Sequence, residues 1–323
     1  MKAIVYTEYG SADVLRFADV AKPAPAPNEV LIKVRAAALN ALDWRMMNGK
    51  PVLLRLMIGG LRKPKVTRPG RDFSGQVEAV GSSVTQFKPG DDVFGACEGT
   101  CAEYVCARED KLALKPAGVS FENAAALPVA GLTALQGLRD TGRIQRGHHV
   151  LVDGASGGVG SFAIQVAKLF GAEVTAACST SKIDTARSLG ADHVIDYTRE
   201  DFARSPKRYD LIFGANAHHS LFDYRRSLAP NGIYVMAGGG VPQILQALSM
   251  AWLLSRIGKK KMPFLMARVT RADLDYLASL VADGTLVPVI DRRYPLRDGA
   301  EAVRYLAEGH ARGKVIVVME HND

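Results

Sequence analysis

A glycine-rich segment contains the residues whose spacing most clearly indicates chemistry. Gly154, Gly157 and Gly160 recur at every third position, between the apolar run 150–152 and a segment, 162–170, with apolar residues at helical spacing. A strand, a tight turn and a helix in this order bring the free N–H groups of the helix N-terminus against a pyrophosphate. The sequence therefore predicts a dinucleotide-binding turn. Its residues are Gly154, Ser156, Gly157, Gly158, Val159 and Gly160.

The residues after the next predicted strand indicate which dinucleotide binds. An NAD site of this design has an acidic residue about 20 positions after the glycine turn, where it binds the ribose 2′-hydroxyl. Here the segment 176–182 contains Ser179 and Lys182 and no acidic residue. Hydroxyls and a lysine suit a 2′-phosphate, because charge-assisted hydrogen bonds to phosphate are strong. The sequence thus favours NADPH.

A metal site is the alternative chemistry that the sequence offers. Cys97, Cys101 and Cys106 lie close together, but their spacing is not the paired pattern of a zinc site and no fourth ligand is near. Cys101 and Cys106 also lie in an alternating segment in which they would point to opposite faces of a strand. We expect reduced cysteines and no metal.

These candidate residues require two domains to position them, because 323 residues exceed one ordinary core. Residues 1–118 contain predicted strands and turns without strand–helix alternation, which indicates a mostly antiparallel, barrel-like domain. From residue 121 helices and strands alternate, as in a doubly wound parallel sheet, with a helix expected near 199–204. Later elements, including a strand at 286–290, indicate a return to the first domain.

Charge and hydropathy limit the partners. The net charge is +8, yet lysines and arginines are scattered, so a solvated basic surface is the simplest interpretation and no nucleic-acid partner is expected. An export signal is missing and no stretch reaches the ~18 apolar residues of a spanning helix, so a cytoplasmic protein without a membrane span is expected. The apolar segment 244–254 is followed by lysines at 259–261. We favour a buried or pocket-lining helix here, and the alternatives are a dimer interface or a helix at a membrane interface. The apolar run 51–61 suits either a cleft wall or domain core.

The chain resembles the medium-chain dehydrogenases/reductases over essentially its whole length. The segments 70–81, 87–95 and 127–134 and the glycine turn occur in the order found in that superfamily. Within that superfamily the chain is most similar to the zinc-independent quinone oxidoreductases, a branch that includes the ζ-crystallin-like and reticulon-4-interacting-protein-like enzymes. The resemblance implies an α/β protein with two domains. They are a GroES-like, mostly antiparallel β-barrel domain (1–122 and 268–323) and a doubly wound Rossmann NADP-binding domain (123–267).

The resemblance also bears on the reaction. Zinc alcohol dehydrogenases of the superfamily carry a catalytic cysteine where this chain has Ala38 or Leu39, and a histidine where it has Arg71. None of these side chains can ligate zinc. Without a Lewis acid, alcohol oxidation is disfavoured, whereas a hydride can still add to an electron-poor double bond. The implied substrate is a small, apolar quinone or α,β-unsaturated carbonyl compound.

Single residues acquire roles from the same resemblance. Asn40 matches the residue that faces the nicotinamide and hydrogen-bonds the substrate oxygen, and Asp43, mainly structural, completes the Asn-x-x-Asp pattern. Thr133 matches the ligand of the nicotinamide carboxamide. Lys182 and Tyr197 match residues that hold the 2′-phosphate. Ser179, Asn216 and Gly238 complete the expected cofactor-binding set.

Several alternatives stay open at this point. Related reductases often have a tyrosine where this chain has Arg45, so no proton donor is assigned and water is an alternative. His218 and His219 are expected to be solvated. A homodimer through the Rossmann domain is expected. The rival functions are an NADPH-binding protein with a membrane- or RNA-binding role and an alcohol dehydrogenase-type enzyme.

Overall fold

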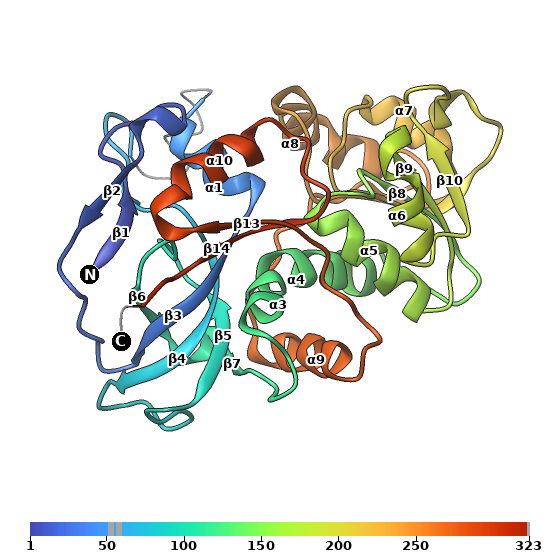
Figure 1. Cartoon of the computed structure of the whole chain (residues 1–323). Coiled ribbons are helices and arrows are strands. Elements are labelled where there is room, and N and C mark those ends of the chain that lie inside the picture. Colours follow the sequence, from blue (N-terminus) through green and yellow to red (C-terminus); the bar gives the residue numbers. More distant parts are fainter. Residues whose placement is uncertain (51–54, 56–59, 322–323) are drawn as a thin grey trace. The chain divides into compact units, whose positions relative to one another are not determined.

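The structure is a computed structural model that describes residues 1–50, 55 and 60–321 (Figure 1). The chain divides into two compact units, one formed by residues 1–129 and 269–323 and the other by residues 130–268. The second unit is therefore inserted within the first. Each unit has its own sheet and its own apolar core.

One large sheet organises the first unit. Among the described residues it has seven strands, in the order β13-β14-β3-β4-β5-β7, with β6 also paired to β3. All pairs are antiparallel except β13 with β14, which confirms the predicted mostly antiparallel domain. The strands are β3 (Glu29–Leu39), β4 (Asp72–Val80), β5 (Asp92–Ala96), β6 (Tyr104–Arg108), β7 (Leu112–Leu114), β13 (Ile290–Pro295) and β14 (Lys314–Val318). A separate antiparallel pair consists of β1 (Lys2–Val5) and β2 (Arg16–Asp19).

Helices connect and cover these strands. They are α1 (Ala41–Asn48), α3 (Phe121–Ala126), α9 (Arg271–Ala282) and α10 (Gly299–Ala307), and α4 (Pro128–Gln136) leads into the second unit. Ser120 caps α3 by accepting a hydrogen bond from the backbone N–H of Asn123. The strand predicted at 286–290 was wrong, because β13 begins only at Ile290. Pro288 lacks the N–H that a strand ladder needs.

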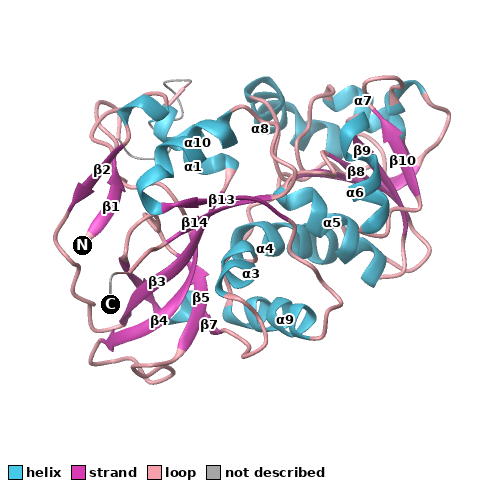
Figure 2. Ribbon diagram, in the orientation of Figure 1, coloured by secondary structure: helices cyan, strands magenta, loops and turns pink. Residues whose placement is uncertain are grey.

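The second unit contains a parallel sheet, as predicted, with its strands in the order β10-β9-β8-β11-β12. Figure 2 labels β8, β9 and β10 of this sheet. Its strands are β8 (His149–Asp153), β9 (Glu173–Cys178), β10 (His193–Asp196), β11 (Tyr209–Gly214) and β12 (Leu228–Met236). Its helices include α5 (Gly158–Leu169), α6 (Ile183–Ser188), α7 (Leu221–Ser227) and α8 (Val241–Arg256). The predicted helix near 199–204 is only a short 3₁₀ turn at Phe202–Arg204. Because parallel strands end at one edge, the turns after β8, β9, β10 and β11 gather there.

Helix α8 shows how the segment 244–254 is used. Ala247, Ala251 and Leu254 are buried, whereas Trp252 is 64% exposed and Leu253 is 50% exposed. The expectation of a buried or pocket-lining helix therefore holds for one face only. Among the described residues no helix is long and apolar enough to cross a membrane.

Candidate functional site

The glycine turn lies at the carboxyl end of β8, directly before α5. Gly154 has a φ of +79°, a left-handed conformation that favours glycine. A Cβ atom on Gly160 would lie 2.1 Å from the carbonyl oxygen of Gly154, so this glycine lets the helix approach the turn. Apart from its chain neighbours, a Cβ atom on Gly157, the N-cap of α5, would meet only the carbonyl oxygen of Gly154, at 3.8 Å, which is an ordinary van der Waals distance. Two glycines therefore shape the turn, whereas a side chain at the third would not clash with the protein.

The other predicted residues of the turn lie in the same segment. Ser156 is buried, and Gly158 and Val159 are half-buried in the first turn of α5. N–H groups at the start of an α-helix have no partner within the helix, and the helix dipole favours a negative charge there. The geometry thus fits a pyrophosphate at this end of α5.

The rim predicted to bind a 2′-phosphate forms at the ends of β9 and β10. Ser179 and Lys182 are half-buried in the turn after β9, and Tyr197 is 56% exposed directly after β10. The backbone N–H of Tyr197 donates to the carbonyl oxygen of Cys178, which holds the two strand ends together. The structure therefore brings these three predicted residues to neighbouring strand ends.

An acidic residue that sequence reasoning missed lies beside this rim. Asp196 ends β10 and accepts hydrogen bonds from the hydroxyl groups of Thr180, at 2.5 Å, and Thr198, at 2.7 Å. These hydrogen bonds, from Thr180 first, hold the pKa of Asp196 below its usual range. The signal that could have found it is the parallel pairing of Asp196 with Cys178, since neighbouring parallel strands end at the same edge. The rim is therefore not free of acidic groups, although this carboxylate is already hydrogen-bonded.

Asn216 and Gly238 follow the next two strands, β11 and β12. The backbone N–H of Asn216 donates to the carbonyl oxygen of Asp153, and the N–H of Gly238 donates to that of Gly214. A Cβ atom on Gly154 would lie 2.7 Å from the Cβ atom of Asn216. Asn216 therefore packs against the glycine turn, which fits its predicted place beside the cofactor.

A buried acidic residue lies directly before the glycine turn. Asp153, the last residue of β8, is 6% exposed and accepts a hydrogen bond of 2.5 Å from the hydroxyl group of Tyr224. Burial raises the pKa of Asp153, and the hydrogen bond from Tyr224 opposes that rise. Tyr224 stacks on Tyr234, with ring centroids 4.2 Å apart. This cluster fixes the strand end from which the glycine turn departs.

The two histidines after β11 differ from each other. His218 is exposed, as predicted. His219, also expected to be solvated, is half-buried: its side chain is 26% exposed, its ring lies 4.4 Å from that of Phe202 and its Nε2 atom lies 3.0 Å from Oδ1 of Asp201. His219 therefore packs against Phe202, a residue of the core of the second unit, at the edge of that core.

In the first unit, Asn40 and Asp43 form the start of α1, a helix that sequence reasoning missed. Asn40 is the N-cap, and its backbone N–H donates to Oδ2 of Asp43 at 2.7 Å. Asp43 is 5% exposed, and burial raises its pKa to about 7. The Asn-x-x-Asp pattern is thus a helix-capping pair in which Asp43 fixes the backbone of Asn40.

A buried ion pair, also missed, holds the side chain of Asn40. Nζ of Lys314 lies 2.9 Å from Oδ2 of Asp72, and these residues are 2% and 0% exposed. Lys314 also donates to Oδ1 of Asn40 at 2.7 Å, and Nδ2 of Asn40 donates to Oδ2 of Asp72 at 2.9 Å. The remaining oxygen of Asp72 accepts the backbone N–H of Val129 at 2.9 Å.

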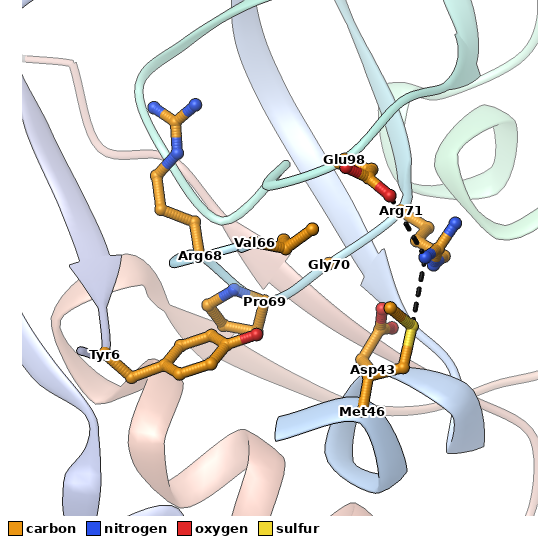
Figure 3. Close-up of a pocket in the computed structure, with 9 residues that line it drawn as sticks. All are labelled: Tyr6, Asp43, Met46, Val66, Arg68, Pro69, Gly70, Arg71 and Glu98. Carbon is orange, nitrogen blue, oxygen red and sulfur yellow. Dashed lines mark hydrogen bonds and ion pairs between the residues drawn. The ribbon is translucent and has the colours of Figure 1, made fainter. Parts of the chain in front are cut away.

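Figure 3 shows a small pocket beside this helix. Its volume of about 10 Å³ is close to the space that one water molecule needs. Its polar side chains are those of Tyr6, Asp43, Arg68, Arg71 and Glu98. Arg71 donates to the sulfur of Met46 at 3.0 Å. Burial, with the nearby charge of Asp43, raises the pKa of Tyr6 to about 12. The pocket thus places one buried acid beside room for a single water.

The remaining predictions are placed as follows. Thr133 is buried in α4 of the second unit. Arg45 is half-buried on α1, with its guanidinium carbon 5.9 Å from the centre of the Trp44 ring. Within the part of the chain that the structure describes, no three His, Cys, Asp or Glu side chains gather as a metal site would require. For the apolar run 51–61, residues 51–54 and 56–59 lie outside the described residues.

Comparisons with known proteins cover the whole chain. Residues 26–119 match the alcohol dehydrogenase GroES-like domain, and residues 189–317 match a domain described as zinc-binding dehydrogenase. The "Quinone-oxidoreductase homolog, chloroplastic" of Spinacia oleracea is 36% identical, over 98% of each chain. The "NADPH-dependent alkenal/one oxidoreductase, chloroplastic" of Arabidopsis thaliana is 36% identical, over 98% of this chain and 79% of the relative.

A solved structure agrees with these relatives. The quinone oxidoreductase from Coxiella burnetii superposes with a TM-score of 0.87 and 32% identity, over 99% of each chain. Fold, domain matches and identity over the full length agree. The chain belongs to the medium-chain dehydrogenase/reductase superfamily, in its zinc-independent quinone oxidoreductase branch.

Proposed function

We propose that this protein is an NADPH-dependent reductase that transfers a hydride to a quinone or an α,β-unsaturated carbonyl compound. The observation that carries the proposal is the glycine turn before α5, in which Gly154 and Gly160 shape the backbone and a Cβ atom on Gly157 would not clash with the protein. The spinach relative and the Coxiella structure are named quinone oxidoreductases, and the Arabidopsis relative is named an NADPH-dependent alkenal/one oxidoreductase. These names support both the cofactor and the substrate class.

The residues present fit NADPH. The turn 154–160 would hold the pyrophosphate, and Ser179, Lys182 and Tyr197 would hold the 2′-phosphate at the ends of β9 and β10. Thr133 would bind the carboxamide, with Asn216 and Gly238 beside the cofactor. Bound NADPH supplies the hydride from its nicotinamide ring.

The protein's own groups act on the substrate oxygen. Hydride addition to an enone or a quinone moves negative charge onto this oxygen, and a fixed N–H donor stabilises that charge. Asn40 provides such a donor, and Asp43 acts as a positioning residue because it holds the backbone N–H of Asn40. Water supplies the proton that completes the reduction.

A stopped-flow assay tests this function. NADPH oxidation should accelerate when the protein is mixed with 1,4-benzoquinone or with an enal, and a rate equal to that without protein would refute the reductase proposal. Lys182→Ala should weaken binding of NADPH but not of NADH. Lys168→Ala is the matched control, because Lys168 lies in the last turn of α5 and pairs with Asp192. Equal losses in both variants would refute the 2′-phosphate assignment.

We also propose a homodimer through the second unit. Trp252 and Leu253 of α8 and Ile257 after it are at least 50% exposed, although they are apolar. The segment 261–264 pairs with β12, the edge strand of the sheet, at Ile233 and Met236, so it lies along that edge. Sedimentation velocity should show a dimer that Trp252→Glu dissociates. A monomer that instead floats with anionic vesicles would favour the membrane-binding alternative, with Arg256 beside Trp252 as a lipid contact.

A further inference from the structure

We propose that Lys314 and Asp72 are positioning residues that fix the side chain of Asn40 as a hydrogen-bond donor toward the substrate. The inference deepens the reductase proposal and rests on it for the identity of the substrate oxygen. It assigns a task to a buried ion pair that neither the glycine turn nor the cofactor site requires.

Strand register brings the three residues together. Asp72, the first residue of β4, is paired with Ala38 on β3, two residues before Asn40. Lys314 begins β14, and the next residue, Val315, is paired with Leu39. The two strands that flank the end of β3 therefore place the carboxylate of Asp72 and the ammonium group of Lys314 beside the amide of Asn40.

The chemistry of the partners fixes which way the amide points. An ammonium group can only donate hydrogen bonds and a carboxylate can only accept them. Oδ1 of Asn40 must therefore face Lys314, at 2.7 Å, and Nδ2 must face Asp72, at 2.9 Å. A reversed amide would set two donors and two acceptors against each other.

This arrangement leaves one N–H of the amide for a ligand. The Nδ2 group carries two N–H bonds, and Asp72 takes one of them. Asn40 itself is half-buried, whereas its two partners are almost completely buried. Lys314 also draws electron density toward Oδ1, which makes the remaining N–H a stronger donor. The site would therefore favour a substrate that presents an acceptor such as a carbonyl oxygen and disfavour one that presents only an N–H donor.

A purely stabilising role explains the ion pair less well. Desolvation can exceed the attraction between two buried charges, so such a pair is weak evidence for stability. Asp72 also accepts the backbone N–H of Val129, but an uncharged acceptor such as an amide oxygen could do the same. The orientation of Asn40, in contrast, needs one partner that only donates and one that only accepts, and Lys314 and Asp72 supply these two groups.

Kinetics of matched variants test the proposal. Lys314→Met should lower kcat by about 10- to 100-fold, as loss of an orienting partner does, with little change in the affinity for NADPH. Lys314→Arg should recover part of kcat, and Asn40→Asp, which cannot donate, should lower kcat at least as far as Lys314→Met. Lys115→Met is the control, because the Lys115 side chain is only 6% exposed and lies 3.5 Å from Asp92, in the same unit. An equal effect of both lysine variants would overturn the proposal.

A readout independent of activity completes the test. In protein labelled with ¹⁵N-asparagine and loaded with NADP⁺, a saturated ketone should shift one Nδ2 proton of Asn40 downfield, with Asn40→Ser identifying the signal. Lys314→Met, or Lys314→Leu if Lys314→Met does not fold, should abolish the shift while the Nδ2 signal of Asn40 itself remains. Absence of the shift in the wild-type protein would overturn the donor assignment. If the shift occurs but neither quinones nor enals accelerate NADPH oxidation, the reductase proposal fails and the amide orientation stands.

Discussion

Asp43 accepts the backbone N–H of Asn40 at 2.7 Å, so the candidate substrate-binding amide and the acid with a pKa of about 7 belong to one turn of one helix. Protonation of Asp43 and the position of Asn40 are therefore coupled. A carboxylate and a carboxylic acid accept this hydrogen bond with different strength.

The pKa of Asp43 predicts a pH dependence of stability. Burial raises this pKa from 3.8 to about 7, so between these values the folded state holds a proton that the unfolded state has released. The free energy of unfolding should then fall as pH rises through this window, by about 4 kcal/mol in total. Urea denaturation of Asp43→Asn should lack this slope.

The control for this experiment is Asp275→Asn, because the Asp275 side chain is 52% exposed. Its free energy of unfolding should follow that of the wild-type protein across the same pH window. A parallel slope for Asp43→Asn and the wild type would show that Asp43 is ionised throughout.

The glycine turn predicts two different effects of the same substitution. Gly160→Ala would place Cβ 2.1 Å from the carbonyl oxygen of Gly154, so it should destabilise the second unit as well as weaken NADPH binding. Gly157→Ala meets no protein atom within 3.4 Å, so its thermal midpoint should stay close to that of the wild type while NADPH affinity falls. Thermal unfolding and cofactor titration would distinguish them. Unchanged NADPH affinity in Gly157→Ala would argue against a phosphate above this residue.

The cluster below the turn predicts unequal effects for two stacked tyrosines. Tyr224→Phe removes the hydroxyl group that donates to the buried Asp153 and should lower the free energy of unfolding by about 1–3 kcal/mol. Tyr234→Phe is the matched variant, because its buried hydroxyl group has no hydrogen-bond partner among the described residues. That change should be neutral or stabilising. Equal losses in denaturant titrations would contradict the assigned role of Tyr224.

The cysteines should react slowly with thiol reagents. Burial raises the pKa of Cys97 to about 12 and that of Cys106 to about 11, and it raises the pKa of Cys101 and Cys178 as well. The thiolate is the reactive form, so little of it is present at pH 8. Ellman's reagent should label the native protein far more slowly than the protein in guanidinium. Rapid labelling of the native protein would refute this assignment.

The sequence predicts best where contacts are local. The glycine turn depends on residues within seven positions, and the parallel sheet follows from alternating strands and helices, which the structure confirms. The network around Asn40 could not be found in this way, because Asp72 and Lys314 lie 32 and 274 residues away along the chain. The strand at 286–290 failed for a local reason, since its apolar run contains Pro288.

The insertion of residues 130–268 within the first unit has a consequence for the order of folding. The second unit is continuous in sequence and can form once it has been synthesised. The donor geometry of Asn40 must wait for Lys314, which the ribosome adds 274 residues later. A nascent chain would therefore acquire its nucleotide-binding turn well before its substrate-binding amide.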